Sequence, residues 1–588
     1  MSAIDWIVFA LFLAYVVWDG MRRSTASKDL EGYYAGSRAI PWWAAGLSIM
    51  ATQASAITVI GTTGQGHEQG MDFVQSYLGL PFAMILLCIF LVPLYRSRAV
   101  LTPYEYLEER FGPVTRSVAS LIFLLSRCLA LGIVIYAPSV ALSAMIGLQT
   151  WESILVIGVL TTMYTVVGGV SAVIWTDVKQ MTVILGGLGI VGFILLRDLL
   201  PQYSFSEMLQ VAGAAGRLNA LEAPANSGLW PRTLEAAAEG AGAPSVWEEK
   251  YNVLAGLFGG LFLHLSYFGC DHSQAQRLLT SKDAAASRKS LLLSAFAKVP
   301  MQSFVLFLGV LMWLFYAVHG QPLLYKTTHV ERAQLPELQP QVRVLEEEFA
   351  VALRARQELM QRLAAQPSAD SDPGLLRAYQ DAVLAVADIR KRARTLVGGA
   401  VDGNGRPKDD GDTNDIFCRF ILDNLPPVVL GLVIAAIFAA AMSSIDSTLN
   451  ALSAATIVDF YRRWLRPRAT EQEALRAGRV TTLLWGVVAT GMALWVGDSK
   501  VAVIELINKV GSFFYGSLLG IFALALFVPR ARGRAGVVGL LGGMGTVVLV
   551  HNTLKVEFLW YNVIGCAGVL LFAALALPFE RRASGPAA

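Results

Sequence analysis

One apolar stretch of this sequence carries oxygen-bearing side chains at helical spacing. Ser443, Asp446, Ser447 and Asn450 stand at positions i, i+3, i+4 and i+7, and Ser444 lies beside them. Residues at these spacings share one face of a helix, so their hydroxyl, carboxylate and amide oxygens would gather there. Hard oxygen donors suit a hard cation such as sodium, and the stretch has no His or Cys to indicate a transition metal. The pattern favours a sodium site over a polar contact between helices, because a carboxylate inside an apolar helix is costly without a partner.

A second apolar stretch has a centre of small and hydroxyl residues. Its polar residues and the glycines that follow are Ser48, Thr52, Gln53, Ser55, Thr58, Gly61, Gly64 and Gly66. A membrane helix of this composition can be interrupted near its middle, which leaves backbone carbonyls free to bind a cation. Small residues also allow close packing of helices, and this stretch alone does not decide between the two interpretations.

Other polar residues interrupt the remaining apolar stretches. Asp177 stands between two of them and can be an ordinary helix-start carboxylate. His264 shares a stretch with Tyr267 and can be either a binding residue or a buried core residue. Lys298 and Asn508 lie in later stretches. Because polar groups are costly in hydrocarbon, each is a candidate for facing a partner or a cavity.

The composition excludes most soluble classes of protein. The chain has 588 residues, of which 55% are hydrophobic and 15% charged, whereas soluble domains carry about 25% charged residues. The net charge of +3 is too small to indicate nucleic-acid binding. The five cysteines form no CxxC pair or Cys/His spacing, so neither a disulfide framework nor a zinc site is expected. No nucleophile–base pair or metal triad indicates an enzyme.

Apolar runs of about 20 residues, the length that crosses a bilayer, predict an all-α polytopic membrane protein. We expect thirteen transmembrane helices, at 3–20, 40–64, 73–95, 117–144, 151–173, 177–199, 252–271, 290–317, 425–454, 477–496, 501–528, 534–552 and 558–578. The first run has no basic residues before it and is expected to span the membrane rather than to be a signal peptide.

Basic residues alternate between the connecting loops. The segments 96–116, 277–289 and 462–479 are rich in Arg and Lys, whereas the short loops of the other set hold only Lys500 and Lys555. Cytoplasmic loops carry the excess of basic residues. We therefore expect a cell (inner) membrane protein with its N-terminus outside and its C-terminus in the cytoplasm.

Two insertions would lie on the outer side. Residues 200–250 are expected to form an irregular loop. Residues 318–424 contain helical patterns at about 340–365 and 374–397, which predict an antiparallel helical hairpin. The acidic stretch 402–415 hints at a calcium loop, but it lacks the glycine and the terminal Glu of an EF-hand, so a solvated loop is favoured.

Five separated motifs resemble the sodium/solute symporter family, whose members include sodium–glucose, sodium–iodide, sodium–proline and sodium–sialic acid symporters. They are Tyr33-Tyr34-Ala35-Gly36 with Trp42-Trp43, the centre of 40–64, Gly168-Gly169 to Trp175-Thr176-Asp177, Gln276-Arg277, and Ala440 to Asn450. The resemblance implies a LeuT-type fold with a 5+5 inverted repeat, in which the second and seventh spans are broken. Its domains would be the first repeat at 40–199, the second at 252–528 with the insertion 318–424, and peripheral helices at 3–20 and 534–578.

The resemblance also implies positions for the sodium ions. A principal site would use backbone carbonyls of Ala51, Ala54 and Ala440 and the hydroxyls of Ser443 and Ser444. A second sodium, found in some members, would lie near Asp177, Asp446, Ser447 and Asn450. The carboxylate of Asp446 stands where the sialic acid transporters carry serine, which leaves the number of sodium ions open.

A solute pocket is implied by the same comparison. Its residues would be Gln53, Thr58, Tyr77, His264, Tyr267, Lys298 and Asn508. Tyr267 would be an inner gate, with Gln53 as its hydrogen-bond partner. Thr58, Tyr77 and His264 replace polar residues that hold a sugar in the galactose symporter, so a hexose is disfavoured. Lys298 and His264 suit a small anion or carboxylate.

The leading interpretation is a sodium-coupled symporter that imports a small polar or anionic organic solute by alternating access. It would work as a monomer in the lipid bilayer, although the sequence does not fix the oligomeric state. The alternative from another class is a transporter-fold sensor, or a partner-binding module that uses the insertion 318–424. A passive channel is disfavoured because interrupted central helices suit alternating access better.

Overall fold

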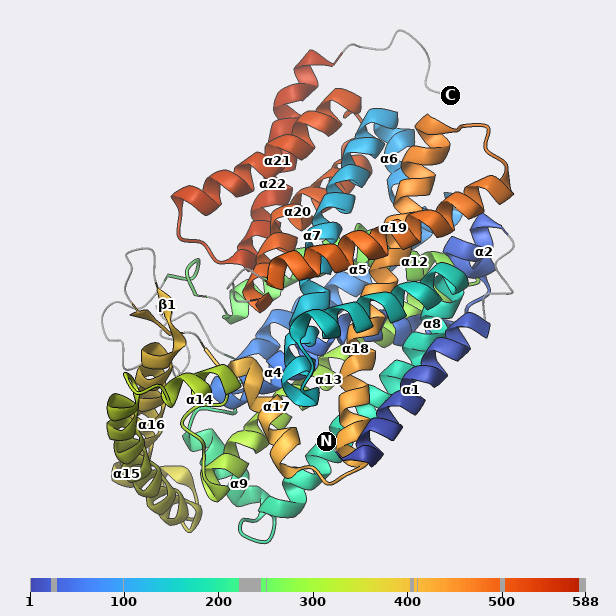
Figure 1. Ribbon diagram of the computed structural model, residues 1–588. Helices are drawn as coiled ribbons and strands as arrows, with labels where there is room; N and C mark the ends of the chain where they lie inside the picture. The colour runs from blue at the N-terminus through green and yellow to red at the C-terminus, as the bar shows by residue number, and fades with distance from the viewer. Residues whose placement is uncertain are drawn as a thin grey trace.

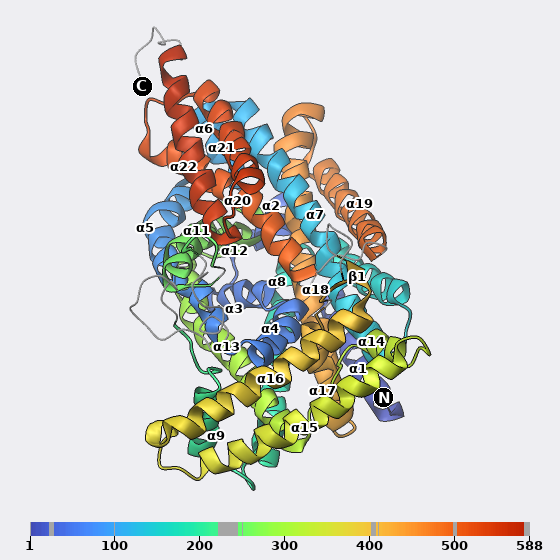
Figure 2. The ribbon, with the colours of Figure 1, turned by 90° about the vertical axis from the view of Figure 1, so that its left-hand side faces the viewer.

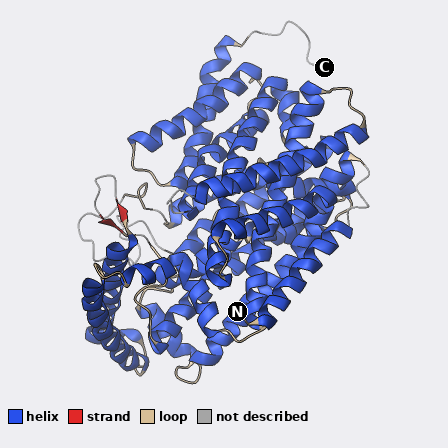
Figure 3. Ribbon diagram, in the orientation of Figure 1, coloured by secondary structure: helices blue, strands red, loops and turns tan. Residues whose placement is uncertain are grey.

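The computed structural model describes residues 2–22, 29–98, 100–221, 245–249, 251–401, 407–409, 411–497 and 503–580. Within these ranges the chain is almost entirely helical (Figure 3). The exception is a two-stranded antiparallel pair, β1 (Ala400–Val401) and β2 (Pro407–Lys408). The prediction of an all-α membrane architecture is confirmed for the described residues, apart from this short pair.

The helices follow one another without sheet layers (Figure 1). In chain order they are α1 (Ala3–Arg22), α2 (Leu30–Ala35), α3 (Trp42–Gln53), α4 (Ala56–Glu68), α5 (Leu80–Arg98), α6 (Tyr104–Phe111), α7 (Pro113–Ile146), α8 (Thr150–Leu199), α9 (Phe205–Ala214), α11 (Gly260–Gly269), α12 (His272–Thr280), α13 (Ala284–His319), α14 (Thr327–Ala333), α15 (Gln339–Ala364), α16 (Pro373–Gly398), α17 (Thr413–Asn424), α18 (Val429–Ala455), α19 (Glu471–Gly497), α20 (Val503–Phe527), α21 (Gly533–Thr553) and α22 (Phe558–Ala576).

Nine helical segments of the described part are long and apolar enough to cross a membrane, or ten if α3 and α4 together form one bent span. Two shorter apolar helical segments, Ala255–Gly269 and Gly511–Phe527, add to these. The number of thirteen spans stays a prediction, because length and composition alone do not decide which of the shorter segments cross.

The predicted interruption of the second span is present. α3 ends at Gln53, Ala54 takes φ −82° and ψ 59°, and α4 begins at Ala56 with Ser55 as its N-cap. The two halves meet at 61°. The last helical bond of α3 runs from the Ala54 N–H to the Met50 carbonyl (2.8 Å). The carbonyls that follow Met50 are therefore at the end of a helix, where the helical donors run out.

A second interruption lies in the predicted seventh span. A π-helical turn at Ala255–Gly259 leads into α11, which ends at Gly269. α12 then begins at His272, with the Asp271 carboxylate accepting from the Ser273 N–H (2.9 Å). Both broken spans expected from the resemblance are therefore found in the structure.

The boundary predicted between the fifth and sixth spans is wrong. The structure has one helical segment, α8, whose turn lies at Gly169 rather than at 174–176. Gly169 has φ +60°, and an added Cβ would lie 2.6 Å from the Tyr33 carbonyl oxygen, so the position requires glycine. Asp177 consequently lies inside the second half of α8 and is fully buried, rather than at a helix start.

Helix α18 forms the centre of the molecule. Every residue from Val433 to Ala455 is buried, and the helix packs against α1, α3, α4, α7, α8, α12 and α19. Figure 1 shows it standing among these helices. Its first half is apolar, as expected of a helix buried on all sides, whereas its second half carries polar side chains from Ser443 to Ser453. These buried polar side chains must find partners within the helix or on neighbouring helices.

The insertion forms a helical hairpin at the end of the molecule opposite α6 (Figures 1 and 2). Helices α15 and α16 pack through a small apolar cluster that includes Val342, Leu345, Phe349, Val386 and Ile389. The preceding insertion, 200–250, was expected to be irregular. It instead contains α9, which a capping box of Ser204 and Glu207 begins, while 222–244 lie outside the described residues.

Ion pairs fasten the hairpin to the transmembrane helices. Both carboxylate oxygens of Asp412 accept from Arg390 Nη2 (2.8 and 2.9 Å). Arg394 contacts Asp409 (2.8 Å) and Glu68 at the end of α4 (3.0 Å). Burial raises the pKa of Asp412, but the two guanidinium groups outweigh burial and hold it below its usual range. The expectation of a solvated loop over 402–415 is therefore wrong for Asp412, which is buried; 402–406 and 410 lie outside the described residues.

We expect Gly64→Ala to destabilise the protein. A Cβ on Gly64 would lie 1.9 Å from the Thr413 carbonyl oxygen, so α4 and α17 would have to separate. Overpacking of this kind costs about 1–3 kcal/mol, and the thermal midpoint of the purified protein should fall by several degrees. Gly186→Ala is the matched control, because no atom lies within 4 Å of its added Cβ. Equal midpoints for the two variants would contradict the close approach of α4 and α17.

Candidate functional site

The interrupted α3 meets the polar face of α18. The Ser443 hydroxyl donates to the Ala51 carbonyl (3.0 Å) and lies 3.2 Å from the Ala440 carbonyl. The Ser444 hydroxyl donates to the Thr52 carbonyl (3.0 Å). Four of the residues predicted for the principal sodium site thus come together: Ala51, Ala440, Ser443 and Ser444.

The arrangement follows from the break at Ala54. The carbonyls of Ala51, Thr52 and Gln53 are at the end of α3, and side-chain hydroxyls of Ser443, Ser444 and Thr58 donate to them. A hydroxyl carries lone pairs as well as a proton. The same oxygens can therefore turn toward a cation that would enter between the carbonyls and the serines. Ala54 is buried at the break itself, and its role as a ligand stays a prediction.

A second polar cluster lies next to the first and is organised by an arginine. The fully buried Arg277 of α12 donates through Nε to the Ser48 hydroxyl (3.3 Å), and its Nη2 contacts the Ser447 hydroxyl and lies 3.7 Å from Asp177. Ser48 donates to Asp177 (2.5 Å), and Thr52 lies 3.0 Å from Ser447. Asp177 and Ser447, predicted for a second sodium, are thus linked through Arg277.

Asp446 is hydrogen-bonded to α8. The Tyr164 hydroxyl donates to one of its carboxylate oxygens (2.6 Å). Among the described residues, the other oxygen of Asp446, one oxygen of Asp177 and the amide of Gln180 are buried without a hydrogen-bond partner. Unsatisfied buried oxygens are costly, and a cation bound among them would satisfy them. The donor set therefore fits sodium.

Asn450 has a different partner from the one implied by the resemblance. Its side-chain oxygen accepts from Gln276 (2.7 Å), which also donates to the Tyr34 carbonyl (2.8 Å). These bonds tie α18 to α12 and α2. The role of Asn450 as a sodium ligand stays a prediction.

Sequence reasoning missed three side chains that organise these clusters. Arg277 was noted only as part of a family motif, and Tyr164 was not singled out. The third, Arg127 of α7, pairs with Asp271 (2.5 Å), and its guanidinium lies over the ring of Tyr267 (5.2 Å). An arginine inside an apolar run is the signal that could have identified Arg127.

Part of the predicted solute pocket also comes together. The rings of Tyr77 and His264 stack at 5.7 Å and 26°. The Lys298 amine lies 5.7 Å from the Tyr77 ring centre and has no hydrogen-bond partner among the described residues, although Lys298 is buried. His264 contacts the Ser76 carbonyl (3.3 Å). A stacked aromatic pair and an unpartnered amine provide an apolar face and a cation within one region.

The hydrogen-bond partner predicted for Tyr267, the inner gate, is wrong. The Tyr267 hydroxyl accepts from Gln274 (2.9 Å), whereas the Gln53 side-chain oxygen has no hydrogen-bond partner among the described residues. Gln274 follows the break of the seventh span and therefore reaches Tyr267 within the same segment. Thr58 donates to the Gln53 carbonyl (3.0 Å). Asn508 lies in α20, but its side chain is outside the described part of the structure.

Comparison with known proteins gives one family. Its model, described as the sodium:solute symporter family, matches residues 33–330 and 400–543 of this chain. The residues between these two ranges include all of α15 and α16.

Several relatives match over most of the chain. The sodium-dependent multivitamin transporter of Oryctolagus cuniculus is 27% identical, covering 92% of this chain and 69% of its own length. The sodium/sialic acid symporter SiaT of Proteus mirabilis is 24% identical, covering 98% and 95%. The human sodium/iodide cotransporter is 24% identical, covering 92% and 68%.

The fold is also found among solved structures. A sodium-coupled sialic acid symporter, described as substrate-bound and outward-open with a novel sodium site, superposes with a TM-score of 0.73. The two are 22% identical, and the match covers 99% of this chain and 98% of that chain. The likeness confirms the predicted fold class.

Proposed function

The chain belongs to the sodium:solute symporter family and is a sodium-coupled membrane transporter of a small solute rather than an enzyme; we propose that it imports a small polar or anionic organic solute by alternating access. The observation that carries the proposal is the contact of Ser443 and Ser444 with carbonyls at the broken end of α3. Sodium would bind among these oxygens together with Ala54 and Ala440.

A sodium site between α3 and α18 suits the coupling of sodium binding to a conformational change. α3 and α18 are separate helices, so an ion held between them would favour the arrangement in which both sets of oxygens face each other. A ligand shifts a conformational equilibrium only by its difference in affinity for the two states. Sodium bound here would have such a difference, because movement of α3 relative to α18 separates the two halves of its site.

We propose a second sodium site around Asp177, Asp446 and Ser447. Its support is the set of buried, unpartnered carboxylate oxygens beside Arg277. The number of sodium ions decides how steep a gradient the transporter can build. One charge moved through 100 mV supplies about 2.3 kcal/mol, and a tenfold gradient adds about 1.4 kcal/mol. For an uncharged solute, one sodium would support accumulation of several hundredfold, and two on the order of 10⁵. A solute with one negative charge cancels the voltage contribution of one sodium, which lowers these values to about tenfold and roughly several thousandfold.

The solute is proposed to bind near Tyr77, His264 and Lys298, with Gln53, Thr58, Tyr267 and Asn508 completing the pocket. The buried amine of Lys298 supports an anionic group on the solute. Relatives of this chain are named for sialic acid, iodide and monocarboxylates, all of which are anions. Function as a monomer is part of the proposal, because the residues proposed for both sodium sites come from one chain.

The orientation is proposed from the basic loops. Arg96 donates to the Leu279 carbonyl (3.2 Å), and Arg463 pairs with Glu108 of α6 (2.7 Å), so arginines from distant loops gather at one end. Helix α6 lies opposite the α15–α16 hairpin (Figure 1). Basic loops face the cytoplasm. We therefore place the hairpin and the N-terminus outside and the C-terminus inside a cell (inner) membrane.

Transport by the purified protein in proteoliposomes tests the proposal. A thermal-shift screen of organic anions, with sodium or potassium, first selects the solute; sialic acid and pyruvate are the first probes. Accumulation of the radiolabelled solute should require an inward sodium gradient or a negative interior voltage. Ser443→Ala and Ser444→Ala should each raise the half-saturating sodium concentration at least several-fold, because each removes one oxygen ligand.

Thr448→Ala is the matched control for these variants. Its hydroxyl lies on the same helix but bonds back only to the Ser444 carbonyl (2.8 Å), so its sodium dependence should be that of the unaltered protein. Accumulation without sodium or voltage would remove the symport proposal. Unchanged sodium dependence in both serine variants would remove only the site assignment.

The second site predicts an effect of Asp446→Asn on stoichiometry. The amide oxygen still accepts from Tyr164, but the charge that would attract a second cation is lost. The Hill coefficient for sodium should fall from above one to about one, and the charge moved per solute should decrease. Asp423→Asn, at an exposed pair with Arg419, is the control. A Hill coefficient that stays above one in Asp446→Asn would contradict a second sodium at this position.

A further inference from the structure

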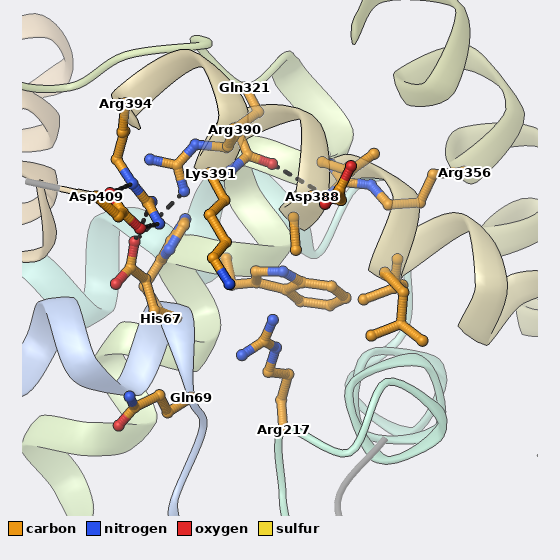
Figure 4. Close-up of a pocket in the computed structure, with 16 residues that line it drawn as sticks. His67, Gln69, Arg217, Gln321, Arg356, Asp388, Arg390, Lys391, Arg394 and Asp409 are labelled. Carbon is orange, nitrogen blue, oxygen red and sulfur yellow. Dashed lines mark hydrogen bonds and ion pairs between the residues drawn. The ribbon is translucent and has the colours of Figure 1, made fainter. Parts of the chain in front are cut away.

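A cavity of about 540 Å³ lies between the hairpin and the transmembrane helices (Figure 4). Its walls come from the end of α4, the end of α13, the segment after α9, and the two hairpin helices. This volume is within the range of small-molecule sites, about 300–1,000 Å³. The cavity is separate from the sodium and solute clusters, whose residues are not among those that line it.

The hairpin walls are a feature of this chain. The family match stops at 330 and resumes at 400, so the cavity residues Arg356, Asp388 and Lys391 fall outside it. The hairpin is nevertheless docked firmly. Gln357 donates to the Ala317 carbonyl at the end of α13 (2.9 Å), and Gln210 of α9 donates to the Leu363 carbonyl (2.9 Å). The cavity is therefore walled by elements that pack against one another, and it is open on one side.

Arg356 has an unused edge inside this cavity. It is 1% exposed, and its Nη1 donates to the Gln321 side-chain oxygen (3.1 Å). Its Nε and Nη2 are buried without a hydrogen-bond partner. These two nitrogens form one side of the planar guanidinium group, the fork that holds a carboxylate or phosphate through two parallel hydrogen bonds. A buried charge without an anion is costly, so this edge fits an anionic ligand.

Three further arginines and one lysine line the cavity. Arg390 and Arg394 are already held by Asp412, Asp409 and Glu68. Lys391 is exposed at the cavity rim, and Arg217 points into the cavity from below in Figure 4.

The charge of Arg356 is kept at neutral pH. Burial lowers its pKa to about 10, which still leaves the guanidinium protonated. Arg356 therefore presents a full positive charge to the cavity.

Trp313 gives the cavity an apolar face. The indole is 3% exposed, and the guanidinium groups of Arg217 and Arg356 lie over it at 5.6 and 5.7 Å from the ring centre. Val383, Val386 and Ala387 add apolar lining. Inorganic anions would leave this surface uncovered, whereas an organic anion would cover it and gain from burial of apolar area.

We propose that the hairpin and the adjoining transmembrane helices form a binding site for a small organic carboxylate, whose acid group is held by the free edge of Arg356 and whose apolar part packs against Trp313. Lys391 supplies a second cation at the rim. A ligand held here contacts both the hairpin and α4, and so joins the insertion, which lies outside the family match, to one half of the broken span. The site does not depend on sodium, and its existence does not rest on the proposed transport function.

The test is fluorine NMR of 4-fluorobenzoate with the purified full-length protein in nanodiscs. This probe has one carboxylate and one planar apolar ring. Its signal should broaden saturably, equally in sodium and in choline buffer, while the neutral 4-fluorobenzamide should not compete. Arg356→Gln should weaken binding at least tenfold. Arg356→Lys should also weaken binding, because an amine keeps the charge but cannot donate two parallel hydrogen bonds to a carboxylate.

Two further variants separate binding from folding. Lys391→Gln alters an exposed side chain and should weaken binding several-fold with an unchanged thermal midpoint. Arg343→Gln, on the exposed face of α15 and paired only with Glu347 among the described residues, should bind as the unaltered protein does. The proposal is overturned if 4-fluorobenzoate shows no saturable binding, if the benzamide binds equally well, or if Arg356 and Lys391 variants keep the original affinity. Binding that requires sodium would place the probe in the central pathway and would also overturn it.

Discussion

The structure depends on how the backbone carbonyls at the last turn of α3 find hydrogen-bond donors. A broken helix inside a membrane leaves carbonyls that water cannot reach, and each must find a donor in the protein. Hydroxyls of Ser443, Ser444 and Thr58 meet this need. The bonds hold α3 against α18, which belongs to the most deeply buried of the candidate membrane spans in the described part of the chain. The carbonyl oxygens can accept a hydrogen bond from these hydroxyls or bind a cation. The same groups that stabilise the break in α3 are therefore the groups that would bind sodium.

A second consequence of burial is the network around Arg277. A guanidinium in this position must be surrounded by acceptors, and Ser48, Ser447 and Asp177 provide them from three different helices. Breaking such a network by removing one partner would leave another charge uncompensated. Among the described residues, one carboxylate oxygen each of Asp177 and Asp446 has no hydrogen-bond partner, and these oxygens are the proposed ligands of a further cation. The two clusters share α3 and α18, so sodium in either would act on the same pair of helices.

Much of this arrangement could be predicted from the sequence. The spacing of Ser443, Asp446 and Ser447 indicated one polar helical face. The hydroxyl-rich run before Gly61 was compatible with a broken helix or with close helix packing, and the family resemblance implied the break. The position of Arg277 could not be predicted, because its partners lie far away in the chain and periodicity says nothing of such contacts. The turn at Gly169 was missed because the polar run 175–177 gave a stronger signal. The cavity at Arg356 depends on how the hairpin docks, which the sequence of the hairpin alone does not specify.

Equilibrium binding of radioactive ²²Na⁺ to the purified protein tests the central claim most directly, because it needs no knowledge of the solute. Unlabelled sodium should displace the label and potassium should not. The double variant Ser443→Ala, Ser444→Ala should lose binding at the principal site and retain less ²²Na⁺ per protein at every sodium concentration below saturation. The same binding curve for the double variant and the unaltered protein would contradict a sodium site between α3 and α18.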